Sequence, residues 1–358
     1  MRVEHDWTTG IRTLETDALQ NTGVNPLFVA TALVIVSTGV IWKGSEVLEA
    51  SAERLSKHYG LPVAVHGAVV VAVGSSFPEL STVVISTLLH GEFSLGVGAI
   101  VGSAVFNLLV IPAFSALSSE RLESTRDLVH KDAQFYIISV LVLFATFALG
   151  ATYVPGGTNQ AAVLTPALVV FPLLTYGIYV FLHYQDVREH TQSEDIAIKS
   201  AHEWGRLVVS LALIAIGVEG IVRGALEFGA VFDTPPAFWG ITVIAIATSL
   251  PDTFVSVRAA RQGSSVTSLT NVLGSNTFNL LVAIPVGVLI AGATTVNFLV
   301  AVPLLGFLGI ATLVFIVSAR TDLKISNSEA YVFLALYAVF LIWMGLETAG
   351  ISQTVRGL

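Results

Sequence analysis

Two short segments of the chain carry the same order of small residues, hydroxyl side chains, a proline and an acid. Residues 74–79 read Gly-Ser-Ser-Phe-Pro-Glu, and residues 247–252 read Ala-Thr-Ser-Leu-Pro-Asp. The acids Glu79 and Asp252 fall deep in apolar stretches, with no Lys or Arg at comparable depth. A carboxylate in such surroundings is costly unless a positive charge balances it. The pair therefore requires a partner from outside the chain, and a metal cation fits that need.

A second pair of motifs follows the acids at nearly the same distance. Residues 102–110 (Gly-Ser-Ala-Val-Phe-Asn-Leu-Leu-Val) and 274–282 (Gly-Ser-Asn-Thr-Phe-Asn-Leu-Leu-Val) are identical at seven of nine positions. Asn107 follows the first acid by 28 residues, and Asn279 follows the second by 27. Two copies of one composite motif indicate an internal repeat.

The prolines, hydroxyls and amides of these motifs supply further oxygen atoms. Pro78 and Pro251 lack a backbone donor, so upstream carbonyls lose their usual helical bonds, and we expect free carbonyls near Ala72 and Ala245. Hard oxygen ligands without His or Cys suit Ca²⁺ and Na⁺, not zinc or copper. The candidate ligands are Glu79, Asp252, Ser75, Ser76, Ser103, Asn107, Thr248, Ser249, Ser275, Asn279, Ala72 and Ala245.

The two carboxylates also set the charge of the bound ion. Ionised together, Glu79 and Asp252 balance one Ca²⁺ with no charge left over. When the divalent ion leaves, monovalent cations or protons must neutralise the pair, or two bare charges remain in an apolar interior. This requirement predicts obligatory exchange of ions and disfavours a passive leak.

Some polar residues of the motifs have an alternative role, because Ser, Asn and Gly also pack helices together in membranes. The ligand role is favoured for Asn107 and Asn279, which are in register with each other and with the acids. Helix packing is favoured for Asn271, Asn276, Pro112 and Pro285. We expect His66 and His90, which have no acidic partner in the sequence pattern, not to bind metal, and the acids of 186–203 to be solvated.

The elements that must position these residues are membrane-spanning helices. Apolar residues make up 54% of the 358 residues and charged residues only 12%, and the mean hydropathy is +0.80. Lys and Arg are absent between Lys57 and Arg121, between Lys131 and Arg188, and between Arg261 and Arg320. Each gap exceeds the roughly 20 residues that cross a bilayer as a helix. The absence of Cys excludes disulfides and Cys-ligated metals, and the net charge of −8 without a basic cluster gives no nucleic-acid footprint.

The apolar blocks predict an all-α protein of about ten transmembrane helices. They cover 26–42, 61–90, 94–118, 133–151, 162–184, 205–226, 237–260, 265–292, 296–318 and 328–347. The first and sixth helices could extend into the amphipathic stretches 43–59 and 219–229. The second and eighth are long enough to be tilted or interrupted.

The basic residues orient these helices in the membrane. Of the 17 Lys and Arg residues, 13 fall on one side of the predicted topology and four on the other. The positive-inside rule then places both termini outside the cell and segment 185–204 in the cytoplasm, which indicates a cell-membrane protein. Residues 1–25 are too polar for a cleaved signal peptide and are expected to form an extracellular tail.

The position of the repeats in this topology makes them inverted. The first copy, 72–112, falls on helices two and three, and the second copy, 245–285, falls on helices seven and eight. Five helices separate the copies, and an odd number reverses orientation. We therefore expect two five-helix halves, 26–184 and 205–358, joined by the short 185–204 loop, with a substrate site near the midplane.

At these residues the sequence resembles the Ca²⁺/cation antiporter superfamily, whose repeats carry G-[ST]-S-x-P-[ED] and then G-S-x-x-x-[ND]. Segments Gly74–Glu79, Ile100–Asn107, Thr248–Phe254 and Asn271–Asn279 look like the Na⁺/Ca²⁺ exchanger branch. The resemblance extends to 43–60 and the ten-helix layout. It implies that the twelve candidate ligands bind Ca²⁺ and Na⁺ in turn, that several Na⁺ are exchanged per Ca²⁺, and that the first and sixth helices slide. It implies a transporter without enzymatic activity or a cofactor.

Two departures from the family pattern bear on the dependence on K⁺ and on regulation by Ca²⁺. Asn279 stands where many prokaryotic members and the K⁺-dependent exchangers have Asp, which disfavours K⁺ co-transport. The 185–204 loop is too short for a regulatory Ca²⁺-binding domain. A Ca²⁺/H⁺ antiporter and a K⁺-dependent exchanger stay open as alternatives. An intramembrane hydrolase using the acid pair is disfavoured, because the sequence has no HExxH motif and a catalytic dyad needs no duplicated ligands.

Overall fold

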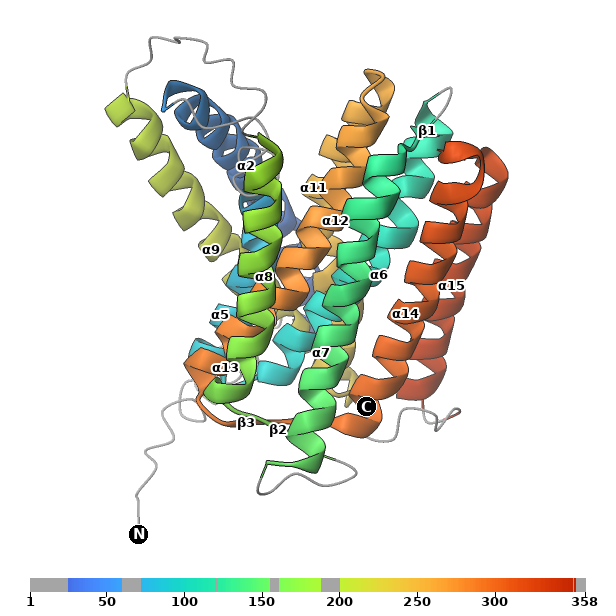
Figure 1. The fold of residues 1–358 in the computed structure, drawn as a ribbon. Helices are drawn as coiled ribbons and strands as arrows, with labels where there is room; N and C mark the ends of the chain where they lie inside the picture. The colour runs from blue at the N-terminus through green and yellow to red at the C-terminus, as the bar shows by residue number, and fades with distance from the viewer. Residues whose placement is uncertain are drawn as a thin grey trace.

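The computed structural model describes residues 25–59, 72–119, 122–154, 161–187, 200–349 and 351. Within these ranges the chain is nearly all helical, and most helices run along a common direction (Figure 1). Nine of the described helical stretches are long and apolar enough to cross a membrane. The predicted second helix, 61–90, is described only from residue 72, so residues 61–71 of that prediction lie outside the described part.

The first half of the chain contributes five predicted spans. Its elements are α2 (Pro26–His58), α4 (Ala72–Ser75), α5 (Phe77–His90), α6 (Phe93–Ser118), β1 (Leu122–Glu123), the π-helical η2 (Leu128–Ala133), α7 (Gln134–Thr152), β2 (Ala161–Leu164) and α8 (Pro166–Val187). The second predicted span is interrupted as expected, because α4 and α5 are separated by a turn at Ser76. The start of the fifth span was wrong: residues 162–164 form strand β2, and the helix begins at Pro166.

The second half repeats this order. Its elements are α9 (Ser200–Phe232), α10 (Pro236–Trp239), η3 (Gly240–Ile244), α11 (Ala245–Arg261), α12 (Ser265–Phe278), η4 (Asn279–Ala283), α13 (Ile284–Ala291), β3 (Thr294–Asn297), α14 (Phe298–Arg320), η5 (Thr321–Leu323), β4 (Lys324–Ile325) and α15 (Asn327–Thr348). The eighth span is interrupted by a π-helical turn at Asn279. The predicted extensions are confirmed, since α2 and α9 each have 33 residues.

Two short antiparallel ribbons each join a connection of the first half to a connection of the second half. β1 pairs with β4 with Leu122 opposite Ile325, and β2 pairs with β3 with Ala161 opposite Asn297. β1 and β3 each follow the third span of their half, whereas β2 and β4 each follow the fourth span. The ribbons lie at opposite ends of the bundle in Figure 1. Equivalent segments at opposite ends are what an inverted repeat requires.

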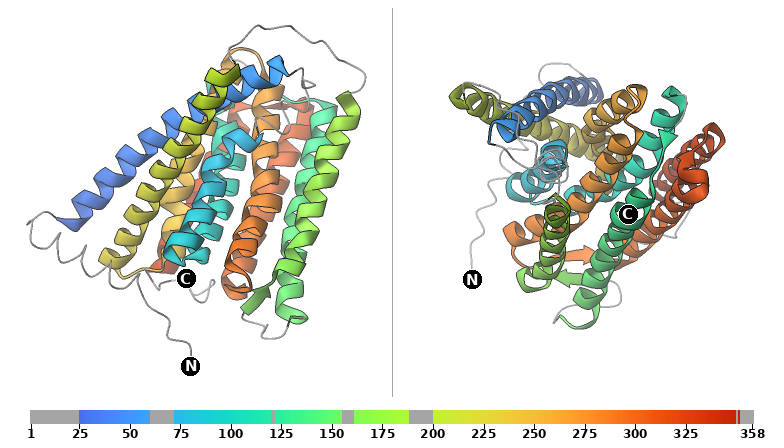
Figure 2. Two further views of the ribbon diagram at one scale, coloured as in Figure 1. Left: turned by 90° about the vertical axis from the view of Figure 1, so that its left-hand side faces the viewer. Right: turned by 45° about the horizontal axis from the view of Figure 1, so that its top comes forward.

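Helices α2 and α9, the first span of each half, pack tightly against each other. Figure 2 shows them side by side, tilted away from the direction of the other helices. A Cβ atom at Gly217 would lie 2.7 Å from Ile41 and 3.0 Å from the Ser37 carbonyl, and a Cβ atom at Gly44 would lie 2.7 Å from Ile214. Small residues at such contacts let membrane helices approach closely. The pair therefore forms one unit beside the rest of the bundle.

Helix α6 lies at the centre of the remaining helices. Its side chains are buried on every face, and Ile100, Ala104 and Leu108 are fully inaccessible. A helix that is apolar all round is suited to such a core position. It contacts α11, α12, α14 and α15 from the other half, so α6 holds the two halves together.

The closest approach of α6 to the second half predicts a stability effect at Gly102. A Cβ atom there would collide with the Ile241 carbonyl and would lie 2.8 Å from the Ala245 Cβ. We expect Gly102→Ala to lower stability by about 1–3 kcal/mol, the usual cost of overpacking, because helix backbone cannot yield as a flexible side chain can. Thermal unfolding of the purified protein in detergent measures the change.

The matched control is Gly39→Ala in α2, where a Cβ atom meets nothing within 4 Å. Alanine favours helix over glycine by roughly 0.5–1 kcal/mol, so this variant should unfold at the wild-type temperature or above it. Equal stability of the two variants would contradict the close packing of α6 on η3.

Candidate ion-binding site

Glu79 and Asp252 lie on α5 and α11, from opposite halves of the chain. Their side chains are 0% and 1% exposed. Glu79 stands in the first turn of α5, where the helix dipole favours a negative charge. The helix starts there because Pro78 occupies one of the first two positions, where the missing N–H costs nothing. The sequence thus places a carboxylate at a helix start in the interior of the bundle.

The two alanines predicted to offer free carbonyls both begin helices. Ala72 is the first residue of α4, and Ala245 is the first residue of α11. In the second half the irregular turn is η3, which ends directly before Ala245. The Thr248 hydroxyl donates to the Ile244 carbonyl at 3.0 Å and lies 3.5 Å from the carbonyl oxygen of Ala245. The equivalent alanines therefore occupy matching places, each at the first residue of a described helix on the acid-bearing segment of its half.

Two close hydroxyl pairs join the halves. Ser75 Oγ lies 2.8 Å from Ser275 Oγ, and Ser103 Oγ lies 2.8 Å from Ser249 Oγ. Each pair links the acid-bearing segment of one half to the amide-bearing helix of the other half. Ser76 adds a weaker contact, donating to the Ser275 carbonyl at 3.4 Å. The motifs that are separate in the sequence thus meet in one place.

Each acid contacts one hydroxyl from its own half and one from the other half. Ser103 donates to Glu79 Oε1 at 3.4 Å, and the Thr248 hydroxyl also interacts with Glu79. Asp252 interacts with both hydroxyls of the Ser75–Ser275 pair. Because the equivalent residues make equivalent contacts, the two acids form a pseudo-symmetric pair between the repeats.

The two candidate amides are fully buried but differ in their partners. Asn107 Nδ2 donates to Asn276 Oδ1 at 3.1 Å and lies 3.5 Å from Ser103 Oγ. Asn279 begins η4, which packs against α5 and α6, and its amide has no hydrogen-bond partner within the described part of the chain. The expectation that Asn276 packs helices together agrees with its bond to the Ala104 carbonyl of α6, at 3.0 Å.

Several oxygen atoms of these side chains have no hydrogen-bond donor. Buried polar atoms are normally paired, because an unpaired one loses its hydration without compensation. Within the described ranges no group of three or more His, Cys, Asp or Glu could hold a metal, and the candidate ligands are two carboxylates and neutral oxygens. The unpaired atoms are Glu79 Oε2, Asp252 Oδ1, Asn107 Oδ1, Asn279 Oδ1 and Asn279 Nδ2.

A third carboxylate near the pair did not emerge from the sequence. Glu49 on α2 lies close enough to Asp252 for their negative charges to repel each other, and its Oε1 is buried without a partner. The sequence predicts residues 43–59 as an amphipathic extension of the first helix but does not single out Glu49. The polar face of that extension was the available signal, but its direction depends on how α2 packs against α4 and α11.

The expectation that His90 lacks an acidic partner was wrong. His90 Nε2 lies 2.9 Å from Glu219 Oε2, and Glu219 Oε1 accepts from Arg223 Nε at 2.6 Å. His90 ends α5 and Glu219 lies in α9, so 129 residues of sequence separate the partners. Only the packing of α5 against α9 brings them together.

One acid expected to be solvated is instead buried. Glu203 is 7% exposed and accepts from Arg54 Nε at 3.0 Å. Helix α9 begins at Ser200, earlier than predicted, and α2 continues to His58, so Glu203 faces a helix and not water. This ion pair ties the ends of α2 and α9 together.

The structure shares its fold with a solved transporter. The sodium-calcium exchanger NCX_Mj, soaked with Na⁺ and Sr²⁺, superposes with a TM-score of 0.61 at 22% identity, covering 88% of this chain and 98% of that chain. A structure described as the sodium/calcium exchanger from Methanococcus jannaschii gives 0.59 at 22% identity, with 88% and 98% covered. At this identity the likeness concerns the fold, ten membrane helices in two inverted repeats.

Sequence comparisons extend the likeness. The inner membrane protein YrbG of Escherichia coli is 27% identical over 274 residues, covering 74% of this chain and 81% of that protein. The sodium/calcium exchanger MaX1 of Methanosarcina acetivorans is 25% identical over 344 residues, covering 86% and 97%. A family model described as "Sodium/calcium exchanger protein" matches residues 29–185 and 202–346. Because these ranges contain both repeats and most of the chain, the protein belongs to the sodium/calcium exchanger family.

Proposed function

We propose that this protein is a secondary active antiporter that exchanges Na⁺ for Ca²⁺ and normally extrudes Ca²⁺. The observation that carries the proposal is the pair of buried acids, Glu79 and Asp252, each with an oxygen that has no hydrogen-bond donor. Family membership and the inverted-repeat fold support the same function. Ca²⁺ and Na⁺ are the transported substrates, not cofactors.

The transported ions bind to the oxygen atoms gathered between the repeats. Glu79 and Asp252 balance the charge of Ca²⁺, and the neutral oxygens complete the coordination of Ca²⁺ and Na⁺ in turn. All ten candidate side chains are at most 1% exposed, so the bound ion would exchange its water for protein oxygens. The neutral ligands are Ser75, Ser76, Ser103, Asn107, Thr248, Ser249, Ser275 and Asn279, with the carbonyls of Ala72 and Ala245.

Exchange follows from the cost of an empty site. Without a cation, two carboxylates would stand unbalanced in a low-dielectric interior, so the bundle does not rearrange until Na⁺ replaces Ca²⁺. The rearrangement is a sliding of the α2–α9 pair beside the helices that hold the site. The close glycine contacts within this pair and the Arg54–Glu203 ion pair support its movement as one unit.

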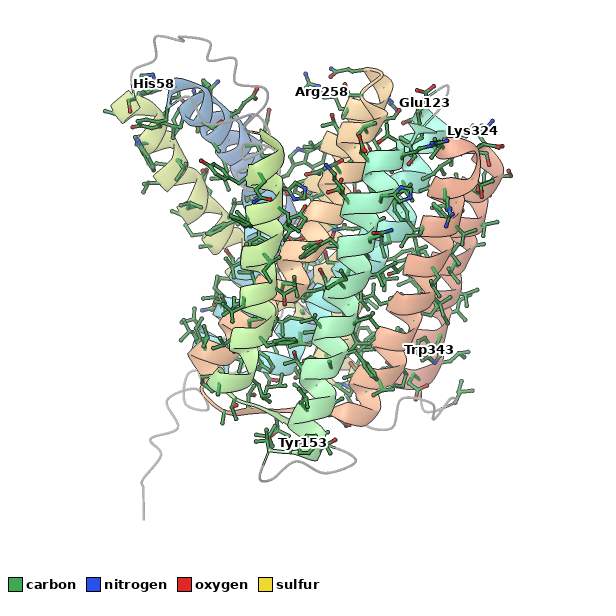
Figure 3. The ribbon with its side chains drawn as sticks, viewed as in Figure 1. His58, Glu123, Tyr153, Arg258, Lys324 and Trp343 are labelled. Carbon is green, nitrogen blue, oxygen red and sulfur yellow. The ribbon has the colours of Figure 1, made fainter. Side chains whose placement is uncertain are left out.

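The protein lies in the cell membrane with both termini outside. Segment 185–204 is cytoplasmic, residues 1–25 form an extracellular tail, and 26–184 and 205–358 are the two repeats. The distribution of basic residues supports this orientation: Arg258 and Lys324 lie at the same end of the bundle, opposite the end that carries Tyr153 (Figure 3). Exposed apolar side chains such as Phe28 and Leu174 contact lipid.

The first prediction tests the coupling ion. Purified protein in liposomes loaded with Na⁺ should take up radioactive Ca²⁺ in K⁺-free medium, because Na⁺ leaving down its gradient drives Ca²⁺ inward. Replacing internal Na⁺ with choline should abolish the uptake. Uptake that does not depend on Na⁺ but is driven by a pH gradient would instead establish a Ca²⁺/H⁺ antiporter. Uptake that requires K⁺ would establish a K⁺-dependent exchanger.

The second prediction tests the acids. Glu79→Gln and Asp252→Asn should each abolish Ca²⁺ uptake, since one remaining carboxylate cannot balance a divalent ion. The same variants should lose the rise in unfolding temperature that Ca²⁺ causes in the wild type. Each variant should stay folded without Ca²⁺, because it removes a buried unpaired charge.

Glu123→Gln, at an exposed position, is the control and should behave as the wild type. Wild-type exchange rates in either site variant would refute the assignment.

The third prediction tests Asn279, which is buried and unpartnered. Asn279→Asp adds a negative charge at this position and should change ion selectivity or Na⁺ coupling. Competition of Sr²⁺ and Mn²⁺ with radioactive Ca²⁺, and the dependence of uptake on Na⁺ concentration, measure the change. If both stay at wild-type values, Asn279 serves only helix packing.

A further inference from the structure

Asn276 lies at the contact between the two amide-bearing helices, outside the set of candidate ligands. It is fully buried, and it makes two hydrogen bonds to α6. Its Nδ2 donates to the Ala104 carbonyl at 3.0 Å, and its Oδ1 accepts from Asn107 Nδ2 at 3.1 Å. A side chain that bonds a backbone group and a candidate ligand at once can control the ligand's orientation.

The donor and acceptor groups of the two amides and the carbonyl determine the direction of these bonds. A backbone carbonyl can only accept a hydrogen bond, so Asn276 must turn its NH₂ group toward Ala104. Its oxygen then faces Asn107, and an oxygen can only accept. Asn107 must therefore present its own NH₂ group to Asn276. The Asn107 oxygen is left pointing the other way, and it has no hydrogen-bond donor.

The second repeat lacks this device. Matching Ser103 with Ser275 matches Ala104 with Asn276, so the first repeat has Ala where the second has Asn. Asn276 bonds to the carbonyl of Ala104, its own counterpart in the other repeat. Among the described residues, neither atom of the amide of Asn279, the counterpart of Asn107, has a hydrogen-bond partner.

We propose that Asn276 is a positioning residue that fixes Asn107 with its oxygen toward the transported cation. The inference rests on the proposed function, because it assumes that Asn107 is an ion ligand. An amide that turned its NH₂ group toward the ion would repel a cation and would have to rotate before it could bind. An amide held with its oxygen toward the ion does not need this rotation. The amide of Asn107 thus presents its oxygen to each transported ion in the same orientation. The amide of Asn279 can change its orientation when one ion replaces another.

The test compares Asn276→Leu with Asn271→Leu in the full-length protein. Both residues lie on α12, but Asn271 Nδ2 donates to Ser256 Oγ at 3.3 Å and has no bond to Asn107. Asn276→Leu should raise the half-saturating Ca²⁺ concentration by about fivefold to tenfold, the effect of one lost buried hydrogen bond. Its maximal rate should change much less. Asn271→Leu should keep the wild-type Ca²⁺ dependence.

A double-variant cycle separates orientation from general packing. If Asn276 acts through Asn107, then Asn107→Ala with Asn276→Leu should cost no more Ca²⁺ affinity than Asn107→Ala alone. Additive losses would overturn the inference, and so would wild-type Ca²⁺ dependence in Asn276→Leu. If Asn276→Leu fails to fold, Asn276→Ser decides in its place, because a serine side chain is too short to span Ala104 and Asn107.

The failure of the inference can be distinguished from the failure of the proposed function. The Ca²⁺-induced rise in unfolding temperature reports binding without transport, so the cycle can be measured by this readout as well. Absence of Na⁺-driven uptake in the wild type would refute the function. Loss of Ca²⁺ binding in Asn107→Ala together with unchanged binding in Asn276→Leu would refute only the positioning role.

Discussion

The structure depends on one electrostatic constraint, the burial of two carboxylates away from water and, among the described residues, without a basic partner. Glu79 and Asp252 come from opposite halves and are fully enclosed between them. Each takes one hydroxyl from its own half and one from the other half, and each keeps an oxygen without a donor. Hydroxyls alone cannot balance two negative charges at low dielectric, so metal cations or protons must neutralise the pair. The same constraint makes exchange the natural mode of transport.

The rest of the bundle consists of a core around this site and a closely packed helix pair beside it. Helix α6, buried on all faces, contacts several helices of the other half and carries Ser103 and Asn107 into the centre. Helices α2 and α9 form a separate pair through close glycine contacts and the Arg54–Glu203 ion pair. A core packed around α6 and a tightly joined α2–α9 pair are the two units that the proposed sliding movement requires.

The inverted repeat gives the site near-symmetry, and the differences between its halves are informative. The hydroxyl contacts of the two acids match across the repeats, but the amides do not. Asn107 is oriented by Asn276, whereas Asn279 lies at a π-helical turn without a partner. One residue pair of the repeat, Ala104 and Asn276, accounts for this difference. In this pseudo-symmetric fold each repeat contributes one carboxylate, but the amide side chains of the two repeats differ in how they are held.

The sequence by itself determined the membrane class, the inverted repeats and the identity of the paired motifs, because hydropathy, charge bias and internal similarity are properties of local segments. It could not determine which distant side chains meet. The pairing of His90 with Glu219, the burial of Glu203, the approach of Glu49 to Asp252 and the orientation of Asn107 all depend on helix packing. The β2 strand, expected as helix, forms because it pairs with β3 from the other half. Contacts between residues over 100 positions apart follow from how the two halves interlock, which no local pattern encodes.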